Sequence, residues 1–300
     1  MRMLYGHKEN NMKRIASVLI FALWAVTAGA QLLWKISGNG LEYSSYIFGT
    51  HHAAPPSMTD EIDGFADAFD ACTRVYGELL FESLSDPEVS MSMAREMMCP
   101  PDSTVSSLLA PEHYAVLDSV MQSLMGVGAK QLDMLKPAAI SAQLAMLMAA
   151  KEFPGMKGEE QLDMAIQNRA KEKGKMTGAL ETVEFQSELL YGTPIIRQAE
   201  DLSESLEQLD EMPEVTREMA EAYRNKDLDR LLLITEREAG SDTDFMERTV
   251  YGRNRDWVEK MKDIMAEGST FFAVGAAHLP GEKGVLALLR QAGYTVEPVE

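Results

Sequence analysis

Short apolar runs separated by turn residues mark both ends of the sequence and predict β-strands there. Leu32–Ser37 and Ser44–Phe48 flank a Gly-Asn-Gly turn, a pattern typical of a β-hairpin. Near the other end, the apolar run Thr270–Val274 is followed by a helical pattern over Glu282–Ala292 and a last strand over Tyr294–Val299. These segments predict a hairpin at the start of the fold and a strand-turn-helix-strand unit at its end.

The middle of the sequence follows the 3.6-residue period of amphipathic helices. Two further strands are predicted over Thr73–Phe81 and Lys175–Leu180. The run after Pro137 has so few polar positions that we expect a central, buried helix there. The predicted helices are Asp60–Ala71, Pro137–Lys151, Gln161–Lys173, Glu184–Leu190, Pro194–Leu209, Pro213–Arg224 and Asp227–Glu238. The expected fold is therefore mixed α/β (α+β), a central mixed β-sheet with a large helical insertion, in a single domain over residues 31–300.

The first 30 residues have the pattern of a secretory signal peptide. Lys13 and Arg14 precede a twelve-residue apolar run, Ile15–Val26, and Ala28-Gly29-Ala30 provides a small-x-small cleavage site before Gln31. Spanning a bilayer takes about 20 residues, so stable membrane insertion after cleavage is not expected. A buried N-terminal helix or an uncleaved anchor is the alternative. The pattern predicts an exported protein, periplasmic or extracellular.

Charge and cysteine content narrow the classes of partner. The chain carries 28 Lys and Arg against 47 Asp and Glu, a formal net charge of −19, which argues against nucleic acid as a partner. Its two cysteines are too few for a disulfide scaffold or a four-thiolate zinc site. In an exported protein Cys72 and Cys99 could form a disulfide, and two independent buried thiols are equally compatible with the sequence.

Two Gly-x-x-His motifs are the main chemical feature. Gly49 leads to His52 and Gly275 to His278, each directly after an apolar strand. A glycine at a strand end allows a sharp turn or a close approach, so the imidazole can face the cleft at the carboxyl edge of the sheet. Glu78 lies within a third apolar run, where a carboxylate is unfavourable unless it is paired, metal-bound or solvated.

Two imidazoles and a carboxylate are a usual donor set for a catalytic divalent ion. Such an ion lowers the pKa of a bound water and supplies hydroxide near neutral pH. The alternative is structural: His52 and His278 are hydrogen-bonded residues at strand ends, and Glu78 pairs with an arginine. The residues alone leave both interpretations open.

The ordered set of motifs resembles the TraB/GumN family, which includes the TIKI metalloproteases. The resemblance covers essentially the whole chain after residue 30. It rests on Tyr46–His52, Glu78, Gly178–Gln186, Arg253-Asn254-Arg255-Asp256-Trp257 and Phe272–Gly281, with Leu162-Asp163 as a further acidic position that lacks the usual nearby glycine. It implies a mixed α/β fold related to erythromycin-esterase-like and ChaN-like proteins.

The resemblance also implies roles for individual residues. His52, His278 and Glu78 become ligands of a divalent ion of the manganese, cobalt or zinc class, or a combination of ligands and base. Arg253 would bind a substrate carboxylate or polarise a carbonyl. The alternative is that it forms a salt bridge with Glu181 or another acidic residue. Glu181 in turn would be catalytic, or support a neighbouring group, or be a carboxylate at a helix start.

The other two histidines that follow residue 30 carry weaker expectations. His51 lies beside the motif position and is expected to support a ligand. His113 follows Pro111-Glu112 and is expected on the surface early in a helix.

These residues lead to one principal hypothesis and two alternatives. The principal one is an exported, metal-dependent hydrolase of peptidase type that cleaves a peptide or amide, with a peptide or small molecule as substrate. The first alternative is a non-catalytic protein that binds a peptide, a metal or a tetrapyrrole in the same cleft. The second, a serine esterase, is weaker because the sequence lacks a Gly-x-Ser-x-Gly motif.

Overall fold

The strands form one mixed six-stranded sheet. The computed structural model describes residues 31–153, 160–240 and 242–299, so the expected signal peptide over residues 1–30 lies outside the described residues. The strands are β1 (Leu33–Ser37), β2 (Ser45–Thr50), β3 (Arg74–Gly77), β4 (Met176–Ala179), β5 (Thr270–Gly275) and β6 (Thr295–Pro298). Their order is β4-β3-β5-β2-β1-β6. β4, β3, β5 and β2 are parallel neighbours, whereas β1 is antiparallel to β2 and to β6.

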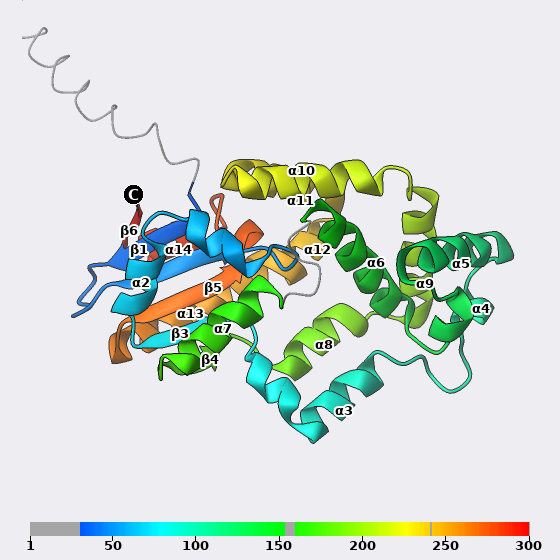
Figure 1. Ribbon diagram of the computed structural model, residues 1–300, viewed down its shortest axis with the longest axis horizontal. Helices are drawn as coiled ribbons and strands as arrows, with labels where there is room; N and C mark the ends of the chain where they lie inside the picture. The colour runs from blue at the N-terminus through cyan, green and yellow to red at the C-terminus, as the bar shows by residue number, and fades with distance from the viewer. Residues whose placement is uncertain (1–30, 154–159, 241, 300) are drawn as a thin grey trace, which may run out of the picture.

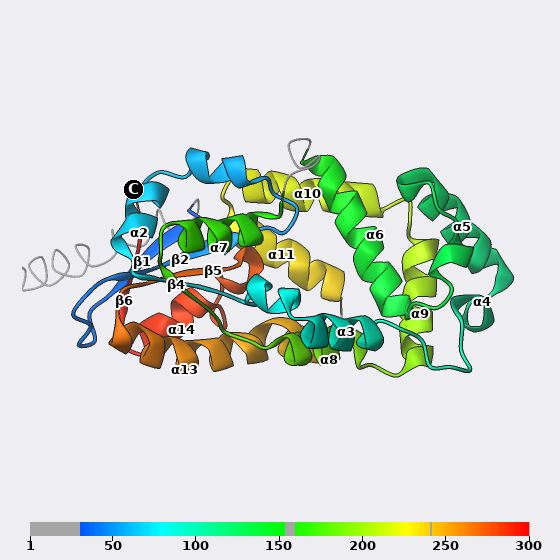
Figure 2. The same ribbon diagram turned by 60° about the horizontal axis from the view of Figure 1, so that its bottom comes forward.

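Helices cover both faces of the sheet and extend from one end of it. In Figure 2, α2 and α7 lie over one face, and α13 and α14 lie under the other. The α-helices are α2 (Phe65–Ala71), α3 (Pro87–Glu96), α4 (Val105–Leu108), α5 (Pro111–Met125), α6 (Pro137–Glu152), α7 (Leu162–Glu172), α8 (Val183–Tyr191), α9 (Ile195–Glu207), α10 (Met212–Arg224), α11 (Leu228–Ala239), α12 (Thr243–Met246), α13 (Gly252–Glu267) and α14 (Val285–Gln291). In the part of the chain that the structure describes, no helix combines the length and the apolar character needed to cross a bilayer.

The helical insertion has an apolar core of its own. Around the sheet, Phe48, Phe65, Phe271 and Trp257 belong to one buried cluster. A second cluster joins α4, α5, α6 and α9, to the right of the sheet in Figure 1. Helix α6 contributes to both, because Ile140, Leu144 and Met148 lie in the second cluster while Met146 and Ala149 pack against the first. This helix therefore connects the sheet to the insertion.

Two predicted elements are shorter in the structure. The helix expected from Asp60 begins only at Phe65, since Gly64 takes a left-handed φ of 70° and a 3-10 helix, Pro56–Glu61, precedes it. The strand expected to reach Phe81 ends at Gly77. Beyond it, the Gln167 side chain forms hydrogen bonds with the backbone in place of a neighbouring strand. It donates to Leu79 O at 2.6 Å and accepts from Phe81 N at 3.0 Å. Glu78 thus lies just past the strand rather than inside it.

Two further expectations about burial are corrected or resolved. Helix α6 is not buried on all sides, because Ala142 and Ala145 are exposed. Cys72 and Cys99 are both buried and free. Cys72 belongs to the cluster around the sheet, whereas the Cys99 thiol donates a hydrogen bond to Leu135 O at 3.0 Å. The two cysteines are therefore independent buried thiols.

Candidate functional site

The two Gly-x-x-His motifs lie side by side at the carboxyl edge of the sheet. Strands β2 and β5 are parallel neighbours, with Gly49 paired to Val274 and Thr50 to Gly275. Their chains leave the sheet in the same direction, which places both histidines over one edge. A short 3-10 helix, Ala276–His278, carries the second histidine directly after β5.

Close packing explains the glycine of each motif. A Cβ on Gly49 would lie 3.0 Å from the Cα and Cβ of Ala276 and from Leu279 Cδ1. A Cβ on Gly275 would lie 3.1 Å from Glu78 Oε1 and 3.4 Å from His278 Cδ2. The first glycine therefore lets β2 approach the turn after β5, and the second leaves room for the carboxylate.

Glu78 joins the sheet edge to a buried arginine. Its Oε1 accepts a hydrogen bond from Gly275 N at 2.7 Å, and its Oε2 accepts one from Arg253 Nη2 at 2.6 Å. Burial acts to raise the pKa of Glu78, but three groups outweigh it: His278, which is protonated at the low pH where Glu78 titrates, the Arg253 guanidinium and the Gly275 N–H. The pKa therefore falls to about 2. Glu78 is therefore ionised at neutral pH.

Arg253 uses every one of its N–H groups inside the protein. Nε and Nη2 donate to the two oxygens of Glu181 at 2.8 Å each, and Nη2 also donates to Glu78. Nη1 donates to Thr249 O at 3.0 Å and lies 3.2 Å from His278 Nε2. A guanidinium group has five N–H donors, and these contacts occupy all of them. In this arrangement Arg253 holds the site together and has no donor left for a substrate.

Glu181 is the second carboxylate of this network. Besides Arg253, it accepts hydrogen bonds from Trp257 Nε1 at 2.7 Å and from Gln186 Nε2 at 2.9 Å. Its side chain is 4% exposed. The arginine and the tryptophan lie four residues apart on α13 and so face the same way. Arg253 is expected either to act on the substrate or to form a salt bridge, and the structure contains the salt bridge, with Glu181.

The orientation of the His278 ring follows from Asn254. The Asn254 amide donates through Nδ2 to His278 O at 3.2 Å and to Lys283 O at 2.9 Å, so its Oδ1 is an acceptor. This oxygen lies 2.7 Å from His278 Nδ1, which must therefore carry the proton. Burial lowers the pKa of His278 to about 4. The ring is neutral, and the lone pair of its Nε2 points at Arg253.

His52 is held by a carboxylate on α7. Its Nδ1 lies 2.9 Å from Asp163 Oδ2, and the Thr50 hydroxyl donates to the other oxygen of Asp163 at 2.5 Å. The negative charge of Asp163 raises the pKa of His52 to about 9. The His52 side chain is 55% exposed, so solvent weakens this effect, and its Nε2 remains available to the cleft.

The remaining histidines lie outside this hydrogen-bonded network. The His51 ring packs between Phe153 and Tyr223, with centroid distances of 5.0 and 5.4 Å, and burial lowers its pKa to about 4. Its Nδ1 accepts from the Ala53 backbone. His113 lies in the first turn of α5, as expected, and pairs with Glu207 at 3.0 Å.

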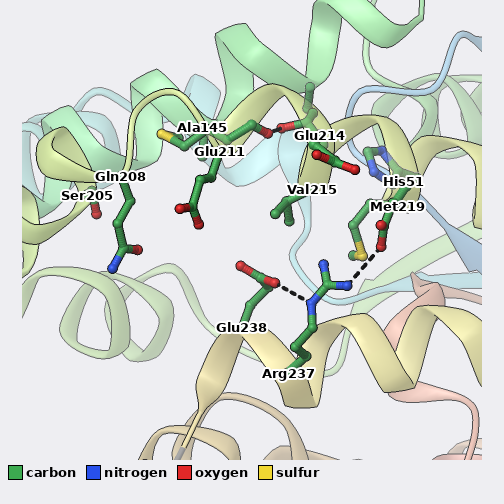
Figure 3. A pocket seen from close by; sticks show the side chains of 14 residues that line it. His51, Ala145, Ser205, Gln208, Glu211, Glu214, Val215, Met219, Arg237 and Glu238 are labelled. Carbon is green, nitrogen blue, oxygen red and sulfur yellow. Dashed lines mark hydrogen bonds and ion pairs between the residues drawn. The ribbon is translucent and has the colours of Figure 1, made fainter.

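A cavity of about 540 Å³ brings the three principal residues together. His52, Glu78 and His278 all line it, together with Arg253, while Glu181 lies behind them. The rest of its lining is mostly apolar and comes from α6, α8, α10 and α11 and from the ends of β2 and β5 with the residues that follow them. A second cavity, of about 870 Å³, adjoins it and shares His51, Ala145, Ala149 and Met219 with it (Figure 3).

The side chains at the site are of the types that bind a divalent ion, but their arrangement does not suit one. His52 and His278 each have one ring nitrogen held by an oxygen and the other nitrogen turned inward, as metal-binding histidines do. The Arg253 guanidinium nevertheless contacts both Glu78 and His278 Nε2, where it supplies the positive charge. Among the described residues, no three His, Cys, Asp or Glu side chains are placed to hold a metal ion.

The site includes residues for which the sequence predicts no role. For Asp163 the sequence indicates only an acidic position, although the residue lies at the second position of α7 and holds His52. Asn254 stands inside the Arg-Asn-x-x-Trp motif, and its position next to Arg253 is the signal that could have pointed to it. Gln186, which donates to Glu181 and to Glu78 at 3.4 Å, is the last residue of the Gly178–Gln186 segment of the resemblance, and that position is the signal that could have pointed to it.

Fold and site define an α/β protein whose cleft is built from two strand-end histidine motifs and a buried Glu-Arg-Glu network. The chain belongs to the TraB/PrgY/gumN family, whose sequence model matches residues 32–298. No solved structure matches the chain significantly.

Several curated proteins are similar to the chain at low identity. Metalloprotease TIKI1 of Xenopus tropicalis is 24% identical over 315 residues, which cover 88% of this chain and 60% of the relative. Metalloprotease TIKI1 of Homo sapiens is 24% identical over 319 residues, covering 88% and 61%. Metalloprotease TIKI2 of Danio rerio is 24% identical over 318 residues, covering 88% and 60%. The chain thus spans about 60% of the length of the curated relatives it matches.

Proposed function

We propose that this protein is an exported hydrolase of peptidase type that cleaves a peptide bond in the 540 Å³ cavity. The observation that carries the proposal is the convergence of His52, Glu78 and His278 on that cavity from three separate strands. The names of the similar proteins, metalloproteases TIKI1 and TIKI2, support a peptide as substrate. Export rests on the basic pair and the apolar run within residues 1–30.

The chain's own residues supply the proton transfers. When the His52 ring is neutral, its Nε2 takes a proton from a water whose oxygen attacks the carbonyl carbon of the peptide. As the carbon–nitrogen bond breaks, the same nitrogen returns the proton to the leaving amine. Asp163 holds the other side of the ring, and the Glu78 charge favours the protonated form. Glu181 and Arg253 position Glu78.

Divalent-metal dependence is the finer part of the proposal. A manganese, cobalt or zinc ion would supply Lewis-acid activation of water or carbonyl. His52, His278 and Glu78 are the donors that the resemblance assigns to it. Since Arg253 now contacts two of these three side chains, they can serve as ligands only where the guanidinium group gives up those contacts. The experiment must therefore measure metal dependence separately from turnover.

Turnover of internally quenched peptides by the full chain tests the proposal. Glu78→Gln keeps the shape of the side chain and removes its charge, so we expect turnover to fall by about 10²–10⁴-fold with the fold retained. His278→Ala should behave similarly. Glu82→Gln is the matched control, because Glu82 is four residues away and exposed, and among the described residues its ion pair is with Lys171. Circular dichroism of each variant separates loss of activity from loss of fold.

Each outcome decides a different part of the proposal. A chelator that abolishes turnover, with recovery on adding manganese, cobalt or zinc, supports metal dependence. Turnover that persists with the chelator but is lost in Glu78→Gln supports the hydrolase and overturns metal dependence. A wild-type chain that binds peptides and cleaves none, with or without added metal, is a binding protein instead.

A further inference from the structure

One face of α6 is apolar and exposed towards the candidate site. Its opposite face is buried, since Ile140, Leu144 and Met148 lie in the core of the helical insertion. Ala142 and Ala145, by contrast, are exposed and line the 540 Å³ cavity. Exposed apolar surface that forms one wall of a cavity marks a place where a ligand replaces water.

Three other helices extend this apolar wall. From α8, Leu189 and Leu190 line the same cavity, and Leu190 is 49% exposed. From α10 and α11, Met219 and Leu231 complete it. The volume of the cavity is within the range of about 300–1,000 Å³ that is usual for ligand pockets.

Charge is confined to one side of the cavity. All but one of the charged or titratable residues in its described lining belong to the site: His52, Glu78, Arg253 and His278. The exception, His51, packs between Phe153 and Tyr223, and burial lowers its pKa to about 4. The helical wall offers no charged partner. A charged substrate side chain on that wall would lose its hydration without compensation, whereas an apolar one loses nothing.

The cavity is not closed beyond this wall. Ala145, Ala149 and Met219 also line the adjoining 870 Å³ cavity, which continues between α10 and α11. Figure 3 shows Glu211 and Arg237 on opposite sides of that second space. A substrate chain can therefore extend past the apolar wall, which fits an elongated peptide rather than a small molecule.

From this division of the cavity we propose that the wall formed by α6 and α8 is a specificity subsite. It seats an uncharged apolar side chain of the peptide next to the bond that is cleaved. The proposal rests on the hydrolase function stated above and names the substrate class of that site. The alanines of α6 set the room available, because larger residues there would fill the space that the substrate side chain takes.

A set of matched peptides tests the subsite. Peptides that differ only in Leu, Ala, Glu or Lys at each position around the cleaved bond are compared for kcat/KM, and for binding by calorimetry, with the full chain. At one position we expect Leu to exceed Glu and Lys by about 10-fold or more. At other positions the four residues should differ less.

Two variants locate the preference on α6. Ala142→Glu places a charge on the wall, so the Leu peptide should lose at least about 10-fold in kcat/KM and the Lys peptide should gain relative to it. Ala145→Leu adds bulk without charge and should move the preference from Leu to Ala. Gln143→Glu is the matched control, because Gln143 is exposed on the same helix and outside the described cavity lining, and it should change neither ratio.

The results separate this proposal from the hydrolase function. Equal turnover of the Leu and Glu peptides by the wild type and both variants would overturn the subsite and leave the hydrolase intact. Preferential binding of the Leu peptide without turnover, lost in Ala142→Glu, would support the subsite and overturn the hydrolase. Absence of both binding and turnover for all peptides would overturn both.

Discussion

Nη1 of Arg253 lies 3.2 Å from Nε2 of His278, and the buried guanidinium group thereby meets the lone pair that a metal ion would use. The same arginine joins Glu78 to Glu181. Its side chain is 9% exposed, and the two carboxylates are 12% and 4% exposed. These ion pairs therefore interact with little screening by solvent.

Removing the Arg253 guanidinium group should destabilise the fold strongly. In Arg253→Ala two buried carboxylates lose their common partner, and we expect the free energy of unfolding to fall by about 3–5 kcal/mol. Arg253→Lys keeps the charge but loses the paired contacts, so its effect should be intermediate. Denaturant titration measures both. Arg237→Ala is the control, because Arg237 is exposed and its ion pairs with Glu218 and Glu238 contribute little to stability.

The pair of His52 and Asp163 should make stability depend on pH in a defined window. The folded-state pKa of His52 is raised from 6.5 to about 9, so the stabilisation is complete below pH 6.5 and disappears as the pH rises through about 9. The difference in unfolding free energy between the wild type and Asp163→Asn should therefore shrink between pH 6.5 and pH 9. A difference that stays constant over this range would show that the ring is not protonated in the folded state.

The same pair should control the pH profile of the reaction. His52 must be neutral at Nε2 either to take a proton or to bind a metal, so kcat/KM should rise with pH up to about 9. In Asp163→Asn the midpoint of this rise should move down towards 6.5, the ordinary value for histidine. A midpoint that does not move would contradict the assignment of the titrating group to His52.

Asn254 should matter for activity more than for folding. Asn254→Ala removes the acceptor that fixes the Nδ1 proton of His278, and we expect turnover to fall about 10–100-fold. If some activity remains, the midpoint of its pH profile shows how the loss of the Asn254 side chain changes the titration of the His278 ring. Asn168→Ala is the control, because Asn168 is on the surface of α7 and donates to Glu160. Equal effects of the two substitutions would show that His278 needs no orientation by Asn254.

Alanine substitutions of the two motif glycines should have different effects. Gly49→Ala crowds Ala276 and Leu279 at 3.0 Å, and overpacking of this kind costs about 1–3 kcal/mol of stability. Gly275→Ala places its Cβ 3.1 Å from Glu78 Oε1, so it should lower turnover more than stability. Thermal melts and peptide turnover for both variants measure the contrast, and the opposite order would contradict the packing described here.

The elements that depend on local pattern could be predicted from the sequence. The hairpin of β1 and β2 is confirmed, because apolar runs around a Gly-Asn-Gly turn specify it locally. The mixed α/β fold is also confirmed, because short apolar runs and stretches with a helical period are likewise local patterns in the sequence. By contrast, Gly64 delays the start of a helix through a left-handed backbone, and Gln167 ends a strand through side-chain hydrogen bonds. Neither leaves a periodic signal.

The site could be predicted only in part. The two motifs and Glu78 stand out locally, and the structure brings them to one cavity. The Glu78–Arg253 pair joins positions 175 apart in the sequence, so only the tertiary fold reveals it. The apolar face of α6 misled the burial prediction, because apolar residues at a ligand cleft and in a core have the same pattern.

The pairing of β2 with β5 makes the site depend on segments that are far apart in the chain. Thr50 meets Gly275 only after β5 has been synthesised, and the Glu78 carboxylate finds its backbone donor 197 residues further along the chain. Contacts between such distant segments form late and slowly in folding. A nascent chain that ends before β5 therefore has the histidine of one motif without the other, and is incapable of the proposed chemistry until Gly275 and His278 have been added.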